Sequence, residues 1–182
     1  MKSILLALIL LTTVGPSVGF AQNEGCKDCI PWEDSRKLTW ADFKGTPKKL
    51  SPNAALTDSG MSIELICDGT TSMAKVKCYF NPNRSWTKDR QSASLLRHEQ
   101  LHFDITELFV RKLRAQLSRF GDDCEALSKH IEEYYQRNYK EFVAYQDRYD
   151  RESEHSLNKE KQAYWEQKVA RELAALKDLA SN

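Results

Sequence analysis

The C-terminal half of the chain lacks the residues that interrupt helices. From Ser92 to Asn182 there is no proline and a single glycine, Gly121, although the whole sequence holds five prolines and seven glycines. This scarcity excludes a fold of short strands and tight turns over that half, because such turns depend on glycine and proline. Apolar residues recur there at helical spacing, and we therefore predict long helices.

The sequence also lacks an excess of either charge. It carries 27 basic and 26 acidic residues, and removal of an N-terminal segment containing Lys2 leaves the two signs equal. Nucleic acids and anionic membranes are recognised through a basic excess on one face. The composition therefore predicts neither as a partner.

A long apolar run is found at the N-terminus alone. Lys2 precedes the apolar residues 4–11, and small or turn-forming residues follow as far as Ala21. This pattern is typical of a secretory signal peptide cleaved after Ala21, and the run is too short to span a bilayer. We expect a signal peptide at 1–21 and one mature domain at 22–182, secreted or periplasmic, with no integral membrane segment.

All five cysteines follow the predicted cleavage point, in a compartment where disulfides persist. Cys67 ends one apolar segment and Cys78 lies inside the next, so a hairpin between them predicts that these two pair. We expect Cys26 or Cys29 to bond Cys124, and the odd count leaves one thiol unassigned.

The two halves together predict an α+β fold. In residues 38–85, the alternating segments 61–67 and 73–80 predict antiparallel strands, and residues 38–40 predict a third short strand. In residues 90–180 we predict a first helix from Ser92 that stops at Gly121. A second begins at Asp122-Asp123 and runs to about Arg151, and a third covers 159–179. The expected architecture is a small N-terminal antiparallel sheet packed on three long, mostly antiparallel helices.

Apolar and aromatic residues also recur at helical spacing along the second and third helices. We expect this stripe to be core rather than a substrate cleft. Its members are Ile131, Tyr134, Tyr135, Phe142 and Tyr145 on the second helix, and Tyr164, Trp165, Val169, Leu173 and Leu176 on the third.

The segment His98-Glu99-Gln100-Leu101-His102 carries the chemistry of the sequence. Two histidines four apart on a helix differ by only about 40° in direction, so both rings point the same way and can hold one ion. In zinc peptidases of this pattern the ion activates a water, and the glutamate accepts its proton. With four histidines in the chain, chance produces the pattern on the order of 0.01 times. We predict a Zn²⁺ site on a zincin-like helix, with His98 and His102 as ligands and Glu99 as general base.

The third ligand must come from elsewhere in the chain. Of the two remaining histidines, His130 lies inside a regular helical run, whereas His155 lies at a break between two helices. We favour His155, with Glu152 or Glu154 as alternatives. Asp104 and Asp150 are candidates to accept the second N–H of a ligand histidine.

Four segments carry a family resemblance: residues 40–47 (WADFKGTP), 55–60 (ALTDSG), 98–105 (HEQLHFDI) and 149–155 (YDRESEH). In these the chain resembles bacterial secreted proteins of unknown function that are predicted to be zinc-dependent proteases. The resemblance runs from about Leu38 to Trp165 and implies protease-like chemistry with His155 as the third ligand. Ser153 stands where the family prefers threonine and Ser156 where it prefers glycine.

The function we predict is zinc-dependent hydrolysis of peptide bonds in an exported protein. Tyr149 or Arg151 is expected to stabilise the oxyanion, and a strand of the sheet to pair with an extended peptide substrate. A cell-wall amide remains open as substrate. The alternative is a non-catalytic exported protein that binds a metal or an envelope component. Structural zinc sites, however, are closed by four protein ligands, and this set offers three beside a glutamate.

Overall fold

Strands come first along the chain and helices follow, in a computed structural model that describes residues 28–67 and 72–180. The predicted signal peptide lies outside these residues. The strands are β1 (Ile30–Pro31), β2 (Ala55–Leu56), β3 (Ser59–Cys67), β4 (Ser72–Phe80) and β5 (Trp86–Thr87). The helices are α1 (Ala93–Leu117), α2 (Cys124–Ser153) and α3 (Lys159–Ala175), with 3₁₀ turns η1 (Trp40–Asp42), η2 (Ser118–Phe120) and η3 (Lys177–Leu179). The fold is α+β, as predicted.

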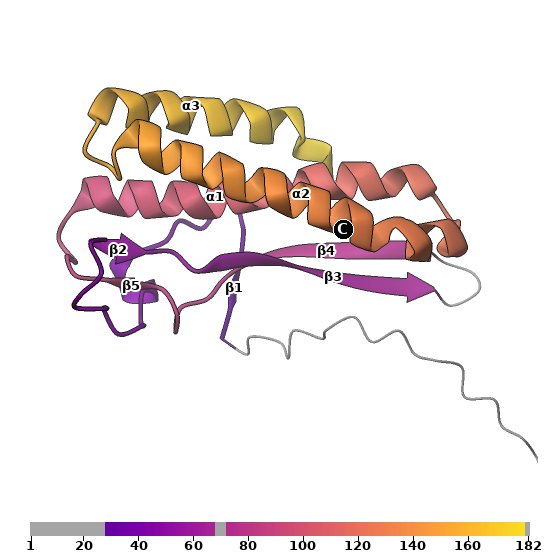
Figure 1. The fold of residues 1–182 in the computed structure, drawn as a ribbon, viewed down its shortest axis with the longest axis horizontal. Helices are drawn as coiled ribbons and strands as arrows, with labels where there is room; N and C mark the ends of the chain where they lie inside the picture. Colours follow the sequence, from indigo (N-terminus) through magenta and orange to yellow (C-terminus); the bar gives the residue numbers. More distant parts are fainter. Residues whose placement is uncertain (1–27, 68–71, 181–182) are drawn as a thin grey trace, which may run out of the picture.

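The antiparallel hairpin of β3 and β4 forms most of the sheet. Its register pairs Ser59 with Phe80 and Cys67 with Ser72, so the two predicted strands are confirmed with nearly the predicted bounds. The strand order is β1-β4-β3, which places β3 at one edge, and β2 and β5 form a separate two-stranded ladder. Figure 1 shows α1 lying along the sheet, with α2 and α3 packed beside it.

The predicted third strand at residues 38–40 is wrong. Thr39 caps the 3₁₀ turn η1 instead, because the carboxylate of Asp42 accepts hydrogen bonds from the Thr39 backbone N–H and hydroxyl. This local pairing holds the backbone in a turn rather than a ladder. The third strand of the sheet is β1, where Ile30 pairs with Phe80.

The helix boundaries follow the predicted signals closely. The Ser92 hydroxyl accepts from Leu95 N at the start of α1, and the Asp123 carboxylate accepts from Ala126 N at the start of α2. Gly121 adopts a positive φ of 53° in the turn between them, a conformation glycine reaches without strain. Within the described ranges, no helix combines the length and the apolar character needed to cross a membrane.

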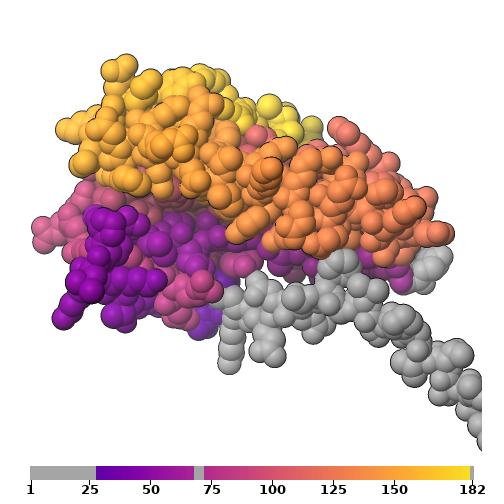
Figure 2. Space-filling model, in the orientation of Figure 1, coloured from indigo at the N-terminus to yellow at the C-terminus, as the bar shows by residue number. Residues whose placement is uncertain are grey.

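The core lies between α1 and its neighbours, and the aromatic stripe contributes to it as predicted, with one exception. Ile131, Phe142 and Trp165 are buried in the core. Tyr164, predicted to point inward, is 46% exposed. It directly precedes the fully buried Trp165, and adjacent helical residues point about 100° apart, so both cannot face the core. Figure 2 shows α2 and α3, in orange to yellow, covering one side of the molecule above the purple β-strand segments.

The predicted pairings of Cys67 with Cys78 and of Cys124 with Cys26 or Cys29 are both wrong, because a disulfide joins Cys67 to Cys124, with Cα atoms 6.0 Å apart. The hairpin register places Ser72, not Cys78, opposite Cys67. Cys78 is six residues farther along β4, about 20 Å in an extended strand. It faces the core as a buried free thiol, and burial raises its pKa well above the ordinary value. Cys29 is also disulfide-bonded, and Cys26 lies outside the described residues.

Replacing Cys67 and Cys124 together by serine is expected to lower the free energy of unfolding by about 4 kcal/mol. The bond closes a separation of 57 residues, and a loop of that length loses about this much chain entropy in the unfolded state. The measurement is denaturant unfolding of the oxidised proteins. The control is Cys78→Ala, which leaves the disulfide in place, and unfolding midpoints equal to wild type in the double variant would contradict the prediction.

Candidate metal centre

The two motif histidines project from the first half of α1 toward the C-terminal end of α2. Their Nε2 atoms lie 3.2 Å apart, and Asp150 Oδ1 lies 3.1 Å from His98 Nε2 and 3.0 Å from His102 Nε2. The three atoms therefore form a nearly equilateral triangle. A tetrahedral zinc ion with bonds of about 2.0–2.1 Å separates its ligands by about 3.3 Å, so the triangle has nearly the size of one face of that tetrahedron.

Two glutamines hold the histidine rings in orientation. His102 Nδ1 lies 2.6 Å from Gln146 Oε1, and the same amide donates through Nε2 to the carbonyl of His102. His98 Nδ1 lies 3.2 Å from Gln162 Oε1, whose Nε2 donates to Glu166. Because the amide orientations are set by these partners, each Nδ1 faces an oxygen and carries the proton. When the rings are neutral, as in a metal complex, each Nε2 then presents its lone pair toward Asp150.

The arrangement of these three atoms is more favourable with a cation between them than without one. Asp150 Oδ1 is buried and accepts no hydrogen bond of good geometry, although two ring nitrogens lie within 3.1 Å. Three atoms bearing lone pairs that face one another repel unless a positive charge lies between them. Two imidazoles and one carboxylate are also a donor set that zinc prefers.

The charges around His102 favour a cation in the same way. Burial lowers the pKa of His102, but Asp150 and Glu99 outweigh it and raise that pKa to about 9. Burial likewise raises the pKa of Asp150, but the two histidines hold it well below its ordinary range. Without an ion, His102 would therefore take a second proton facing Asp150, and a bound divalent cation would take the place of that proton.

Glu99, the predicted general base, is 3% exposed, and its Oε2 is buried without a hydrogen-bond partner. Its charge reaches both His102 and Tyr149. A buried carboxylate oxygen without a partner is costly, and such atoms are often functional. Glu99 is therefore available to accept a proton beside the two histidines.

Tyr149, predicted as an oxyanion donor, lies behind His98. Its hydroxyl donates to Gln162 Oε1 at 2.8 Å and lies 3.2 Å from the His98 carbonyl, and its ring stacks on the His98 ring at 4.7 Å. Burial raises the pKa of Tyr149 far above its ordinary value, so the hydroxyl keeps its proton. These contacts orient His98; a role as oxyanion donor stays a prediction. Arg151, the other candidate, is exposed.

His155, the predicted third ligand, lies at the margin of the centre. Its Nδ1 is 3.7 Å from Asp150 Oδ1, and the ligand atoms of His98, Asp150 and His155 all lie within 4.8 Å of one another. Of the alternative ligands, Glu152 is bound by Arg148 and Trp165, and the exposed Glu154 accepts from Asn158. Among the described residues, the group of three possible metal ligands whose atoms lie together is His98, Asp150 and His155, and it includes neither glutamate; His102 Nε2 lies 3.0 Å from the same Asp150 oxygen.

The two aspartates suggested as partners for the histidine N–H groups do not have that role. Asp104 accepts from Trp32 Nε1 and Gln100 Nε2, away from the histidines, and burial raises its pKa. Asp150 faces the Nε2 atoms rather than the Nδ1 atoms. The roles of Gln146 and Gln162 were not predicted from the sequence. For Gln146 a signal existed, since it precedes Asp150 by four residues on one helix face.

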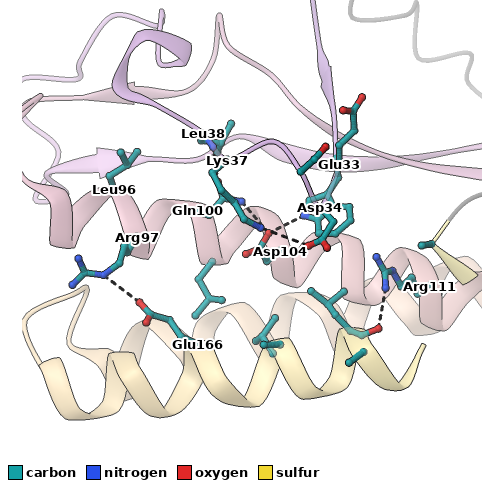
Figure 3. Close-up of a pocket in the computed structure, with 18 of the residues that line it drawn as sticks. Glu33, Asp34, Lys37, Leu38, Leu96, Arg97, Gln100, Asp104, Arg111 and Glu166 are labelled. Carbon is teal, nitrogen blue, oxygen red and sulfur yellow. Dashed lines mark hydrogen bonds and ion pairs between the residues drawn. The ribbon is translucent and has the colours of Figure 1, made fainter. Parts of the chain in front are cut away.

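A groove of about 1130 Å³ lies on another side of α1, between α1, α3 and residues 32–38. Figure 3 shows Asp104 inside it and the Arg97–Glu166 pair, 3.5 Å between Nε and Oε1, bridging α1 and α3. None of the centre's ligand candidates and neither Glu99 nor Tyr149 lines this groove. The polar cluster at the ends of α1 and α2, rather than the groove, is therefore the candidate site.

Gln146→Ala is expected to weaken zinc binding between about 10-fold and 100-fold, because loss of the hydrogen-bond partner that orients a ligand histidine has that effect. In the variant, His102 loses the acceptor of its Nδ1 proton. Zinc affinity measured by competition with a chromogenic chelator tests this. Gln136→Ala, which removes an exposed amide bonded to Glu132 on the same helix, is the control. Equal affinities in the two variants would contradict the assignment.

Residues 69–156 match the model of a family described as bacterial protein of unknown function (DUF922). The match supports a bacterial family of unknown function. The matched segment contains all of α1 and α2, and so includes the two motif histidines, Asp150 and His155. No curated protein and no solved structure matches the chain.

Proposed function

We propose that the protein is an exported zinc-dependent hydrolase of peptide bonds, with its ion held by His98, His102 and Asp150. The observation that carries the proposal is the triangle of two Nε2 atoms and one carboxylate oxygen at 3.0–3.2 Å, with Glu99, whose buried Oε2 has no hydrogen-bond partner, in electrostatic reach of His102. A structural zinc site is closed by four protein ligands, whereas three leave one position for substrate or water. The proposal of export is supported by the N-terminal sequence pattern of residues 1–21.

In this proposal each side chain has one task. A zinc ion bound there would lower the pKa of a water molecule to about 7 and polarise the carbonyl under attack. Glu99 accepts the proton of the attacking water and delivers it to the leaving amine nitrogen, because its buried Oε2 has no hydrogen-bond partner and is free to bind that proton. Gln146 and Gln162 keep both imidazoles in the tautomer that presents Nε2, and Tyr149 holds the ring of His98.

The edge strand β3 supports a peptide as the substrate. Thr57, just before β3, donates from Oγ1 to the Glu99 carbonyl. Ser59 is the first residue of β3, and its Oγ forms a hydrogen bond with Thr106 Oγ1 at 2.7 Å. The Thr106 hydroxyl in turn donates to the His102 carbonyl. The edge therefore begins against the helix that carries the motif. An unpaired strand edge offers backbone groups to an extended peptide. Of the two strands predicted for this role, β3 has the edge position, while β4 lies between β1 and β3.

Metal removal tests the proposal. The exported protein is expected to contain about one zinc ion per chain and to hydrolyse unfolded casein. A chelator should abolish hydrolysis, and added Zn²⁺ should restore it. Metal content by mass spectrometry and peptide release are the two measurements. A protein that binds zinc but cleaves neither casein nor cell-wall crosslinks would be a metal-binding protein without this activity, and the enzymatic proposal would fail.

A further inference from the structure

The turn between α2 and α3 contains three consecutive residues in an unfavourable backbone conformation. Glu154, His155 and Ser156 have φ values of 51°, 51° and 80°, and none of them is glycine. Non-glycine residues rarely adopt this left-handed region, and strain of this kind persists where the surrounding structure holds it, often at functional sites. The strained turn directly follows the helix end that carries Asp150.

The turn changes the direction of His155. If α2 continued, residue 155 would point about 140° away from residue 150, since each helical residue advances by about 100°. Instead, the His155 backbone N–H donates to the Asp150 carbonyl at 3.1 Å, and its Nδ1 lies 3.7 Å from Asp150 Oδ1. Hydrogen bonds from Leu157 N to Glu154 O and from Asn158 N to Ser153 O close the turn. The strained backbone therefore brings the imidazole back to the centre.

His155 lies on the solvent side of the centre. The exposed fraction of the side chain rises from 3% for His98 to 16% for His102, 29% for Asp150 and 68% for His155. The 3.7 Å from His155 to Asp150 is also longer than the 3.0–3.2 Å within the triangle. His155 is therefore the most exposed of these four side chains and the one most open to a substrate arriving from solvent.

We propose that His155 is a catalytic residue that contacts the substrate, with an imidazole N–H donating a hydrogen bond to the carbonyl oxygen under attack, and that it is not required to hold the ion. This inference rests on the proposed function. When the water oxygen bonds to the carbonyl carbon, the π electrons move onto the carbonyl oxygen, and the water proton passes to Glu99. A donor beside that oxygen stabilises the new negative charge. The C–N bond then breaks, and the amine leaves with the proton from Glu99.

Cobalt binding separates a substrate-contacting role from a ligand role. His155→Ala is expected to bind Co²⁺ with an affinity within about threefold of wild type, a smaller change than the loss expected when a residue that orients a ligand is removed. Asp150→Asn is the comparison variant and should lose most of its Co²⁺ affinity. The matched control is His130→Ala, which removes a histidine that lies about 30 Å from Asp150 along α2. A loss of Co²⁺ affinity in His155→Ala as large as that in Asp150→Asn would overturn the inference.

A small anionic ligand tests the hydrogen bond without turnover. Acetohydroxamate binding to the Co²⁺-loaded protein, followed by the visible spectrum, is expected to weaken about tenfold in His155→Ala. His155→Gln, which retains a donor, should recover part of the loss. Equal acetohydroxamate affinities in wild type and His155→Ala would overturn the inference. Absence of hydrolysis by the metal-loaded wild type would overturn the proposed function instead, so the two failures are distinguishable.

Discussion

Asp150→Asn is expected to lower zinc affinity by more than about 100-fold, the upper range for changes that only disturb the orientation of a ligand. The substitution keeps the size of the side chain and one oxygen, but it removes the negative charge that faces both Nε2 atoms at 3.0–3.1 Å. Two neutral imidazoles and a neutral amide oxygen would then hold a divalent cation. The measurement is a competition titration of zinc against a chromogenic chelator at fixed pH.

The matched control for this variant is Asp104→Asn. It makes the same chemical change at another largely buried aspartate, one bonded to Trp32 and Gln100 rather than to the histidines. We expect zinc affinity equal to wild type in this control. If Asp150→Asn bound zinc as tightly as Asp104→Asn, while His155→Ala lost it, His155 would be the third ligand and the triangle would have been misassigned.

Glu99→Gln is expected to reduce hydrolysis by about 10²-fold to 10⁴-fold, the usual contribution of a general base, with one zinc ion per chain retained. The amide keeps the shape of the side chain but cannot accept the proton of the water. The free energy of unfolding is not expected to fall, because Glu99 Oε2 is buried without a partner and the neutral amide is less costly to bury. Peptide release from casein, metal content and thermal unfolding are measured on the same sample.

Glu152→Gln serves as the control for the loss of a helix carboxylate. The sequence offers Glu152 as an alternative metal ligand, but its carboxylate accepts hydrogen bonds from Arg148 and Trp165. Hydrolysis and metal content should both stay at wild-type levels. Glu99→Gln with full activity would remove the general base from the mechanism, even if the metal site were intact.

The sequence predicted those parts of the fold that depend on local chemistry. The absence of proline after Ser92, the caps at Ser92 and Asp123 and the glycine at 121 determine where helices begin and end, and these boundaries are confirmed. The hairpin of β3 and β4 was also predictable, because alternation of apolar and polar residues is a local property of each strand. At Leu38–Trp40 the apolar pattern was too short to predict a strand reliably. The hydrogen bond from the Thr39 backbone N–H to the Asp42 carboxylate favours a turn there instead.

Pairings between distant residues were not readable in this way. Cys67 and Cys124 meet because the end of β3 and the start of α2 lie at the same end of the molecule, which depends on the lengths of α1 and of both strands together (Figure 1). No spacing in the sequence encodes that coincidence. Proximity along the hairpin suggested Cys78 instead, but its register points it into the core.

The features of the candidate centre also fall into those that the sequence determines and those that depend on packing. By itself the sequence determined one helix face with His98, Glu99 and His102, because helical spacing alone aligns two residues four apart. Only the tertiary structure decided what faces them: Asp150 opposite the two Nε2 atoms, Gln146 and Gln162 behind the rings, and His155 turned back by a strained loop. These positions depend on how α2 and α3 pack against α1, and packing is set by contacts across the whole core rather than by any local motif.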